Sequence, residues 1–189
     1  MSLVVLCPMA MEARAVRRGV RYLSDPVQVL CTGMGPKRSR RVGLFDKPVV
    51  VVGIAGAVTD EIAPGEVVVA TDVSAHDVAP IGLAQVVKVA QDIRNAGFTV
   101  HTGSVACVSR LAVGARRQEL ADMGAVAVDM ESAWLLERQR RPAAVVRVVT
   151  DTPSHELRSL SAPAAVFRAL RTIRRIMPAL VTVLVKEVC

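Results

Sequence analysis

The apolar run KPVVVVGIAGAV at residues 47–58 limits the possible folds more than any other part of the sequence. Its residues are continuously apolar instead of alternating with polar ones, a pattern that is typical of a strand buried on both faces. Such a strand needs helices packed above and below its sheet. The run therefore predicts the central strand of an α/β sheet.

Shorter apolar segments and amphipathic segments alternate along the rest of the chain. Further strands are predicted at 3–9, 27–33, 64–73, 98–108, 125–130 and 143–151. Helices are predicted at 11–19, 36–45, 83–97, 115–124, 131–139 and 163–188, the last with a kink near Pro178. Because strands joined through helices run parallel, we expect an α/β fold with a mostly parallel, twisted central sheet flanked by helices on both faces. The length of 189 residues fits one domain over 1–189.

The composition predicts a cytoplasmic protein without metal or disulfides. The first residues, MSLVVLCPMAMEAR, lack the basic lead of a signal peptide. No apolar run reaches the roughly 18 residues of a membrane helix. Cys7, Cys31, Cys107 and Cys189 are scattered without a CxxC pair, which favours reduced thiols. No His/Cys spacing fits zinc, so no metal site and no stable membrane insertion are expected.

The net charge of +7 raises the question of a polyanionic partner. The arginines are spread along the whole chain, and pairs such as Arg116-Arg117 and Arg140-Arg141 are not interleaved with aromatic residues that could stack on bases. This pattern favours a solvated, arginine-rich surface over a nucleic-acid site. Attraction to anionic membrane surfaces stays open.

Acids and glycines cluster where the predicted strands end. These positions are Met9–Glu12, 33–35, 53–56, 129–131 and 150–151. In open parallel sheets, ligands bind beyond the carboxyl ends of the strands. Three acids and two glycine-rich turns should therefore converge on one crevice.

Each of these features also has a structural explanation. Glu12 and Glu131 lie at helix starts, where a carboxylate is favoured by the helix dipole, and Asp129 could cap a helix. Asp151 precedes Thr152-Pro153 and could belong to a turn. The glycines could serve tight turns or let backbone approach a ligand. Singly, each acid is more easily explained by structure, whereas the combination favours a functional site.

Five motifs extend the argument to a family. In chain order they are MAMEARAV, CTGMGPKRS, VVGIAGAVTDEIAPGEVVVAT, AVAVDMESAWLLE and VVRVVTDTP. Together they resemble the nucleoside phosphorylase and nucleosidase superfamily, which contains methylthioadenosine/S-adenosylhomocysteine nucleosidase. The resemblance covers nearly the whole chain and implies cleavage of the N-glycosidic bond of a purine nucleoside.

The resemblance also implies roles for individual residues. Asp151 would act as the general acid that protonates N7 of the leaving purine. Glu131 would bind the ribose hydroxyls and stabilise the oxocarbenium-like centre, and Glu12 would activate the attacking water. The substrate-binding set implied with them is Met130 against the sugar, Ala55 and Gly56 near the nucleophile and purine, and Gly35, Asp129 and Val108.

General chemistry agrees with this division of work. A purine leaves poorly until it is protonated, so the site needs an acid that still carries a proton near neutral pH. Burial beside other carboxylates would supply one. The sugar becomes cationic in the transition state, so an ionised carboxylate beside it helps most at that moment.

Two departures from the family pattern leave the nucleophile open. Ile54 stands where nucleosidases of the family carry Ser or Thr, and the sequence lacks the G-D-P-x-R phosphate loop of bacterial hexameric phosphorylases. Glu12 in place of that loop favours water. Phosphorolysis remains an alternative, with phosphate as co-substrate held by Lys37, Arg38 and the 33–35 turn. No other cofactor is expected. A catalytically degenerate nucleoside-binding module is the non-enzymatic alternative.

The 5′ side of the substrate is also open. The segment ACVSRLAVG lacks the aromatic and Asp that methylthioadenosine nucleosidases carry there, and the stretch at 74–83 is short. The combined pattern GMGP, GIAGAV, VDMESA and TDTPSHEL resembles the hopanoid-biosynthesis branch, which removes adenine from adenosylhopane. The resemblance thus allows a bulky or lipid 5′ substituent on a small-molecule purine nucleoside. It also implies a homodimer, with Trp134 in the core or at the interface.

Overall fold

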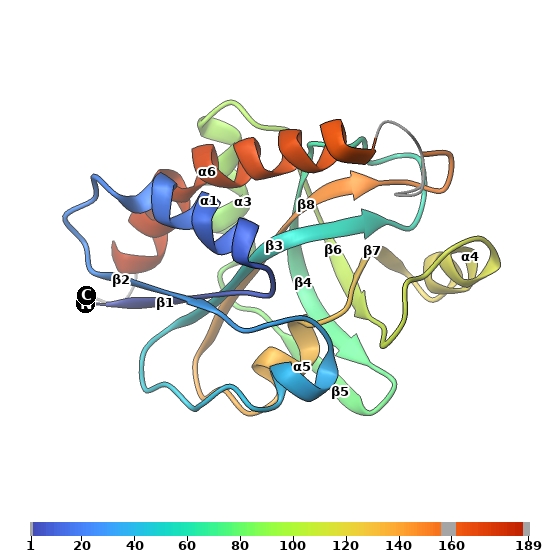
Figure 1. The fold of residues 1–189 in the computed structure, drawn as a ribbon, viewed down its shortest axis with the longest axis horizontal. Helices are drawn as coiled ribbons and strands as arrows, with labels where there is room; N and C mark the ends of the chain where they lie inside the picture. The colour runs from blue at the N-terminus through green and yellow to red at the C-terminus, as the bar shows by residue number, and fades with distance from the viewer. Residues whose placement is uncertain (1, 156–161, 187–189) are drawn as a thin grey trace.

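The computed structural model describes residues 2–155 and 162–186. Its strands are β1 (Leu3–Cys7), β2 (Val27–Cys31), β3 (Val49–Ala57), β4 (Val67–Ala75), β5 (Val78–Gly82), β6 (Val100–Cys107), β7 (Ala125–Asp129) and β8 (Pro142–Asp151). Its helices are α1 (Ala10–Val20), α2 (Pro36–Ser39), α3 (Val86–Asn95), α4 (Ala115–Asp122), α5 (Ser132–Leu136) and α6 (Ala162–Lys186). Figure 1 shows the strands as one twisted layer with helices on both sides.

The sheet has eight strands and is mostly parallel, as predicted. Its order is β2-β1-β3-β7-β6-β4-β5, and β8 pairs with both β3 and β4. Five pairings are parallel, whereas β3–β7, β4–β5 and β4–β8 are antiparallel. The register between β3 and β8 shifts between Ala55 and Gly56, so that Gly56 pairs with Asp151. The carboxyl ends of these two central strands therefore meet.

Two apolar layers enclose the sheet. Helices α1, α3 and α6 cover one face through a cluster that includes Val16, Ile93 and Ile176. The other face packs against α5, where Trp134 and Leu135 are buried. The strand β3 lies between both layers, and its residues 49–52 are fully buried. The expectation of a central strand covered on both faces is confirmed.

Three local predictions were wrong. The helix expected at 36–45 is limited to Pro36–Ser39, because the chain turns after Ser39 and Arg40 reaches out to Asp77 and Glu137. The helix expected at 131–139 is limited to α5. Strand β5 was not predicted; it is an edge strand, where the missing N–H of Pro80 is tolerated.

Other expectations fall on described residues only in part. Helix α6 continues through Pro178, and residues 187 and 188 of the predicted helix lie outside the described residues. Cys7, Cys31 and Cys107 are free thiols, whereas Cys189 lies outside the described range. Trp134 belongs to the core, and its indole N–H donates to Asp77. Within residues 2–155 and 162–186, no helix is both long and apolar enough to cross a bilayer.

Candidate active site

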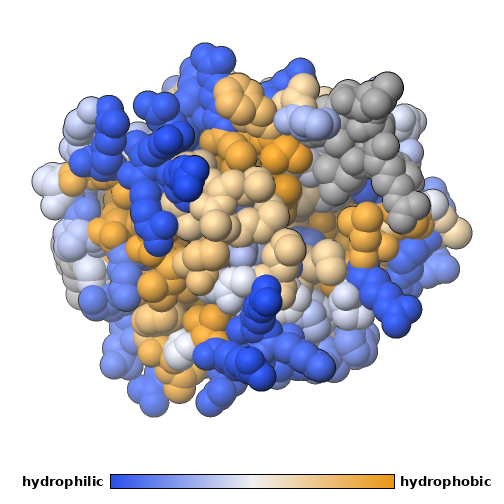
Figure 2. All heavy atoms as spheres, in the orientation of Figure 1, coloured by the Kyte–Doolittle hydropathy of each residue, from blue (hydrophilic) through white to orange (hydrophobic). Residues whose placement is uncertain are grey.

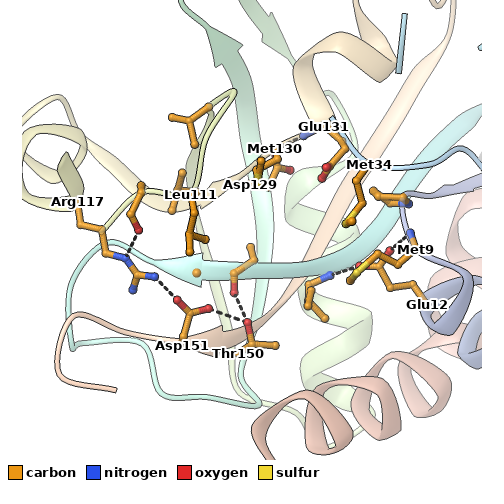
Figure 3. Close-up of a pocket in the computed structure, with 17 residues that line it drawn as sticks. Met9, Glu12, Met34, Leu111, Arg117, Asp129, Met130, Glu131, Thr150 and Asp151 are labelled. Atoms are coloured by element: carbon orange, nitrogen blue, oxygen red, sulfur yellow. Dashed lines mark hydrogen bonds and ion pairs between the residues drawn. The ribbon is translucent and has the colours of Figure 1, made fainter. Parts of the chain in front are cut away.

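A cavity of about 170 Å³ lies at the carboxyl ends of the strands. Its walls are contributed by the ends of β3, β7 and β8, by the segments after β1, β2 and β6, and by α1 and α4 (Figure 3). The lining residues are Pro8, Met9, Glu12, Met34, Ile54, Ala55, Gly56, Val108, Leu111, Ala112, Arg117, Val128, Asp129, Met130, Glu131, Thr150 and Asp151.

The structure brings the three predicted acids to this one cavity. Glu12 comes from the first turn of α1, Glu131 precedes α5, and Asp151 ends β8. Of the predicted substrate-binding residues, those that line the cavity with them are Met130, Ala55, Gly56, Asp129 and Val108. Gly35 lies outside the lining, but its backbone N–H donates to Glu131 Oε1 at 3.0 Å. The catalytic and binding roles themselves stay predictions.

Glu12 is a buried carboxyl group held in a fixed orientation. Its oxygens accept hydrogen bonds from the backbone N–H of Met9, at 2.7 Å, and of Ile54, at 2.8 Å. Burial raises the pKa of Glu12 to about 7, against the opposing influence of Arg147 and these two N–H donors. Near neutral pH this group can therefore accept or release a proton at little cost.

Asp129 and Arg147 form a buried ion pair beneath Glu131. Arg147 Nη2 lies 2.6 Å from Asp129 Oδ2, and both side chains are almost fully buried. Burial by itself would raise the pKa of Asp129, but Arg147 and hydrogen bonds from Cys107, Ser132 and the Glu131 N–H hold it below its ordinary value. Asp129 thus fixes the turn between β7 and α5 that positions Glu131.

Glu131 keeps its own carboxylate at the cavity. Burial raises the pKa of Glu131, and the nearby Asp129 acts in the same direction, whereas Arg147 and the Gly35 N–H oppose the shift. Gly35 has a φ of 84°, in the left-handed region that favours glycine. The glycine-rich turn after β2 therefore orients a carboxylate of the site.

Asp151 pairs with a cation that the sequence did not reveal. Arg117 Nη2 contacts Asp151 Oδ2, and the other guanidinium nitrogens donate to the carbonyl oxygens of Ala112, at 2.9 Å, and Ala57, at 3.0 Å. Thr150 Oγ1 donates to the second Asp151 oxygen at 2.8 Å. The sequence argument expected carboxylates around Asp151 and did not include this contact with Arg117.

Arg117 was also wrongly grouped with the solvated surface arginines. It is only 2% exposed. The sequence of α4, ARRQELAD, is polar and gives no sign that one of two adjacent arginines turns inward. Arg147 carried a stronger signal, since it interrupts the apolar strand VVRVV, and a charge inside a buried strand requires a partner.

Two glycines of β3 make room for these side chains. A Cβ atom at Gly53 would lie 2.3 Å from Arg147 Nη1 and 2.6 Å from Glu12 Oε1. A Cβ atom at Gly56 would lie 2.9 Å from Arg117 Nη2. The glycines were expected to let backbone approach a ligand. In the structure, their lack of a side chain leaves space for buried charged side chains to pack directly against the central strand.

The remaining cavity wall is apolar. Val108, Leu111, Ala112 and Val128 come from the segment after β6 and from β7. Two of them lie at the Asp151 end: Ala112 accepts a hydrogen bond from Arg117, and Val128 pairs with Gly56, which also pairs with Asp151. Figure 3 shows Asp151 and Arg117 at one end of the cavity, and Glu12 with Met9 and Met34 at the other. The site can therefore hold a flat apolar ring near Asp151. It can hold a polar group that becomes positively charged during a reaction near Glu12 and Glu131.

A family model described as the phosphorylase superfamily matches residues 12–178. The chain belongs to the phosphorylase superfamily. This confirms the family inferred from the five motifs. No curated protein sequence matches the chain.

Solved structures share this fold over nearly the whole chain. Futalosine hydrolase of Helicobacter pylori has a TM-score of 0.80 at 17% identity, with 97% of this chain and 98% of that chain covered. The 5′-methylthioadenosine/S-adenosylhomocysteine nucleosidase of Helicobacter pylori has a TM-score of 0.81 at 16% identity, with 97% and 99% covered. The MTA/SAH nucleosidase of Streptococcus pneumoniae has a TM-score of 0.74 at 17% identity, with 96% and 99% covered. At these identities the likeness establishes the fold.

Proposed function

We propose that this member of the phosphorylase superfamily hydrolyses the N-glycosidic bond of a purine nucleoside. The observation that carries the proposal is that Glu12, Glu131 and Asp151 line one cavity from three separate elements. In the reaction the bond between the purine nitrogen and the sugar C1′ breaks, and its electron pair goes to the purine. The purine takes up a proton, and a water oxygen bonds to C1′.

The purine end of the cavity is assigned to the apolar wall beside Asp151. Val108, Ala112 and Val128 offer a surface for a flat ring, and the transfer of a proton to N7 of the base is assigned to Asp151. Asp151 is then left as a carboxylate in a nearly dry site, where the Arg117 guanidinium supplies the counter-charge. Proton donation of this kind contributes roughly 10²- to 10⁴-fold to a rate.

The sugar is assigned to Glu131 and Met130. Glu131 is oriented by the Gly35 N–H, which donates to Oε1, and its carboxylate at the cavity would bind the ribose hydroxyls. Its negative charge stabilises the cationic sugar as the glycosidic bond breaks. Met130 follows Asp129 directly and supplies an apolar contact at the same end of β7.

Water is assigned to Glu12. With a pKa of about 7, this carboxyl group can take the proton of the attacking water at neutral pH. Phosphate would need free cationic or N–H donors, and among the described lining residues Arg117 is the only cation. Because Arg117 is engaged by Asp151 and two carbonyl oxygens, the lining favours water over phosphate.

The reaction type is tested by base release with and without phosphate. Purified protein incubated with adenosine derivatives should release adenine and the free sugar at the same rate in both buffers. Strict phosphate dependence with a sugar-1-phosphate product would establish phosphorolysis instead. No release from any purine nucleoside, together with measurable nucleoside binding, would leave a degenerate binding module.

We further propose adenine as the base and a bulky apolar group at the 5′ position. The cavity of about 170 Å³ is below the roughly 300–1,000 Å³ of typical small-molecule pockets, so a large substituent must lie outside it. The motif resemblance to the hopanoid branch supports the same assignment. Adenine release from adenosylhopane but not from methylthioadenosine is the expected result, and the reverse preference would contradict it.

A further inference from the structure

A second hollow lies outside the sheet, between α1 and α6. This α1/α6 groove has a volume of about 540 Å³. Its lining residues are Met11, Arg14, Ala15 and Arg18 of α1 with Phe167, Leu170, Arg171 and Arg174 of α6. On both helices they follow the spacing i, i+3, i+4, i+7, which places them on one helix face. Two matching helix faces therefore form the groove.

All charges of the α1/α6 groove are positive. Arg14, Arg18, Arg171 and Arg174 are exposed, and their side chains have no hydrogen bond or ion pair with any described residue. No acidic residue occurs in α6, and the only one in α1 is Glu12, which is buried at the cavity. The groove thus presents four uncompensated guanidinium groups to an anionic partner.

The α1/α6 groove also exposes apolar side chains between its arginines. Phe167 is 70% exposed and Met11 is 48% exposed, and Leu170 lies partly buried between them and the core. Figure 2 shows apolar surface beside hydrophilic side chains over α1 and α6. Guanidinium groups beside exposed apolar side chains are the pattern of protein surfaces that lie at the headgroup level of a bilayer.

We propose that the α1/α6 groove docks on the surface of a bilayer that contains anionic phospholipids. The arginines contact lipid phosphates, and Phe167 and Met11 enter the boundary between headgroups and acyl chains. Duplex nucleic acid could also meet the arginines, but it would leave both apolar side chains in water, so the bilayer fits the groove better. Met11 lies between Met9 and Glu12 in the chain, and docking would therefore bring the cavity close to the bilayer.

Vesicle flotation of the full chain tests the docking without any substrate. We expect binding to vesicles of phosphatidylcholine mixed with phosphatidylglycerol, little binding to phosphatidylcholine alone, and release at high salt. Because no nucleoside is present, the result does not depend on the proposed hydrolysis. Failure of hydrolysis and failure of docking are thus separate outcomes.

Matched variants separate the groove from net charge. Arg14→Gln/Arg18→Gln should lower the vesicle partition coefficient by about 25-fold, at about fivefold for each arginine. Arg138→Gln/Arg141→Gln removes the same charge from exposed positions after α5, which lies at the bottom of Figure 1 while α6 lies at the top. This control should change the partition coefficient by less than about threefold.

The apolar contact has its own pair of variants. Phe167→Ala should weaken vesicle binding by about tenfold, whereas Met123→Ala, at a side chain that is 79% exposed outside the groove, should not. Fluorescence of the buried Trp134 checks that each variant is folded. Three results would overturn the proposal. The first is an equal loss of vesicle binding in both arginine double variants, and the second is equal binding to neutral and acidic vesicles. The third is binding to duplex DNA but not to acidic vesicles at the same salt concentration.

Discussion

Replacing Glu12 by Gln should change the pH dependence of stability in a defined way. Glu12 is 1% exposed, and its pKa is about 7 in the folded chain against an ordinary value of 4.5. The folded state therefore holds this proton more tightly than the unfolded state does. Its stabilising contribution is complete below about pH 4.5 and is lost as the pH rises through about 7, a total of roughly 3 kcal/mol.

Gln at this position stays neutral at every pH. The free energy of unfolding of Glu12→Gln, relative to the wild type, should therefore rise by about 1.4 kcal/mol per pH unit between about pH 4.5 and about pH 7, and then level off. Gln offers one acceptor oxygen to the N–H groups of Met9 and Ile54, so a constant cost of about 1 kcal/mol is expected in addition. That cost changes the stability difference between variant and wild type by the same amount at every pH, so the slope of the difference against pH is unchanged.

Urea unfolding measures this difference directly. Trp134 is the only tryptophan and is buried in the core, so its fluorescence reports unfolding at each pH. All other titratable groups contribute equally to the pH dependence of unfolding in variant and wild type, unless they interact with Glu12. Their contributions therefore cancel in the difference. In parallel, kcat/KM of the wild type should rise with pH through about 7, as the base becomes ionised. A pH-independent stability difference, or a wild type that gains on the variant as the pH rises, would refute the assignment of Glu12 as a buried base.

Three further substitutions test the rest of the site. Asp151→Asn should lower base release by roughly 10²- to 10⁴-fold with an unchanged near-UV spectrum, and a rate near that of the wild type would remove Asp151 as the acid. Arg117→Met should lower the free energy of unfolding by about 3–5 kcal/mol, because it leaves a buried carboxylate unpaired. Urea unfolding of Arg117→Met/Asp151→Asn should show that most of the lost free energy of unfolding is restored, and no recovery would argue against the pairing. Gly53→Ala would place a Cβ atom 2.3 Å from Arg147 Nη1 and should cost about 1–3 kcal/mol, whereas Gly43→Ala, with no atom within 4 Å, should be nearly neutral in the same assay.

The placement of the acids could be predicted from the sequence because parallel strands bring their carboxyl ends to one edge. Glu12, Glu131 and Asp151 each follow or end an apolar strand, and this is sufficient to predict that they meet. The position of each carboxylate within the cavity depends on partners far away in the chain. The Gly35 N–H that holds Glu131 is separated from it by 96 residues, and no local pattern indicates that contact.

The buried cations show where the sequence argument failed. Arg117 lies in a polar helix next to Arg116, and only its contacts with Asp151, Ala57 and Ala112 in the folded chain distinguish the two arginines. The helix at 36–45 failed for a similar reason, since the chain turns where Arg40 finds its partner Asp77. Tertiary contacts decided both cases, and local helix preference is too weak to compete with them.

The charge balance of the cavity divides its carboxylates into two kinds. Asp129 and Asp151 each contact a buried arginine directly, so a negative charge on either carboxyl group is compensated within the protein. Glu12 and Glu131 have no such contact, and burial raises the pKa of both. Under the proposed function, these two lie beside the sugar, where positive charge develops as the bond to the purine breaks. A negative charge that burial disfavours in the free protein then becomes favourable in the transition state, which is the condition for binding that accelerates a reaction.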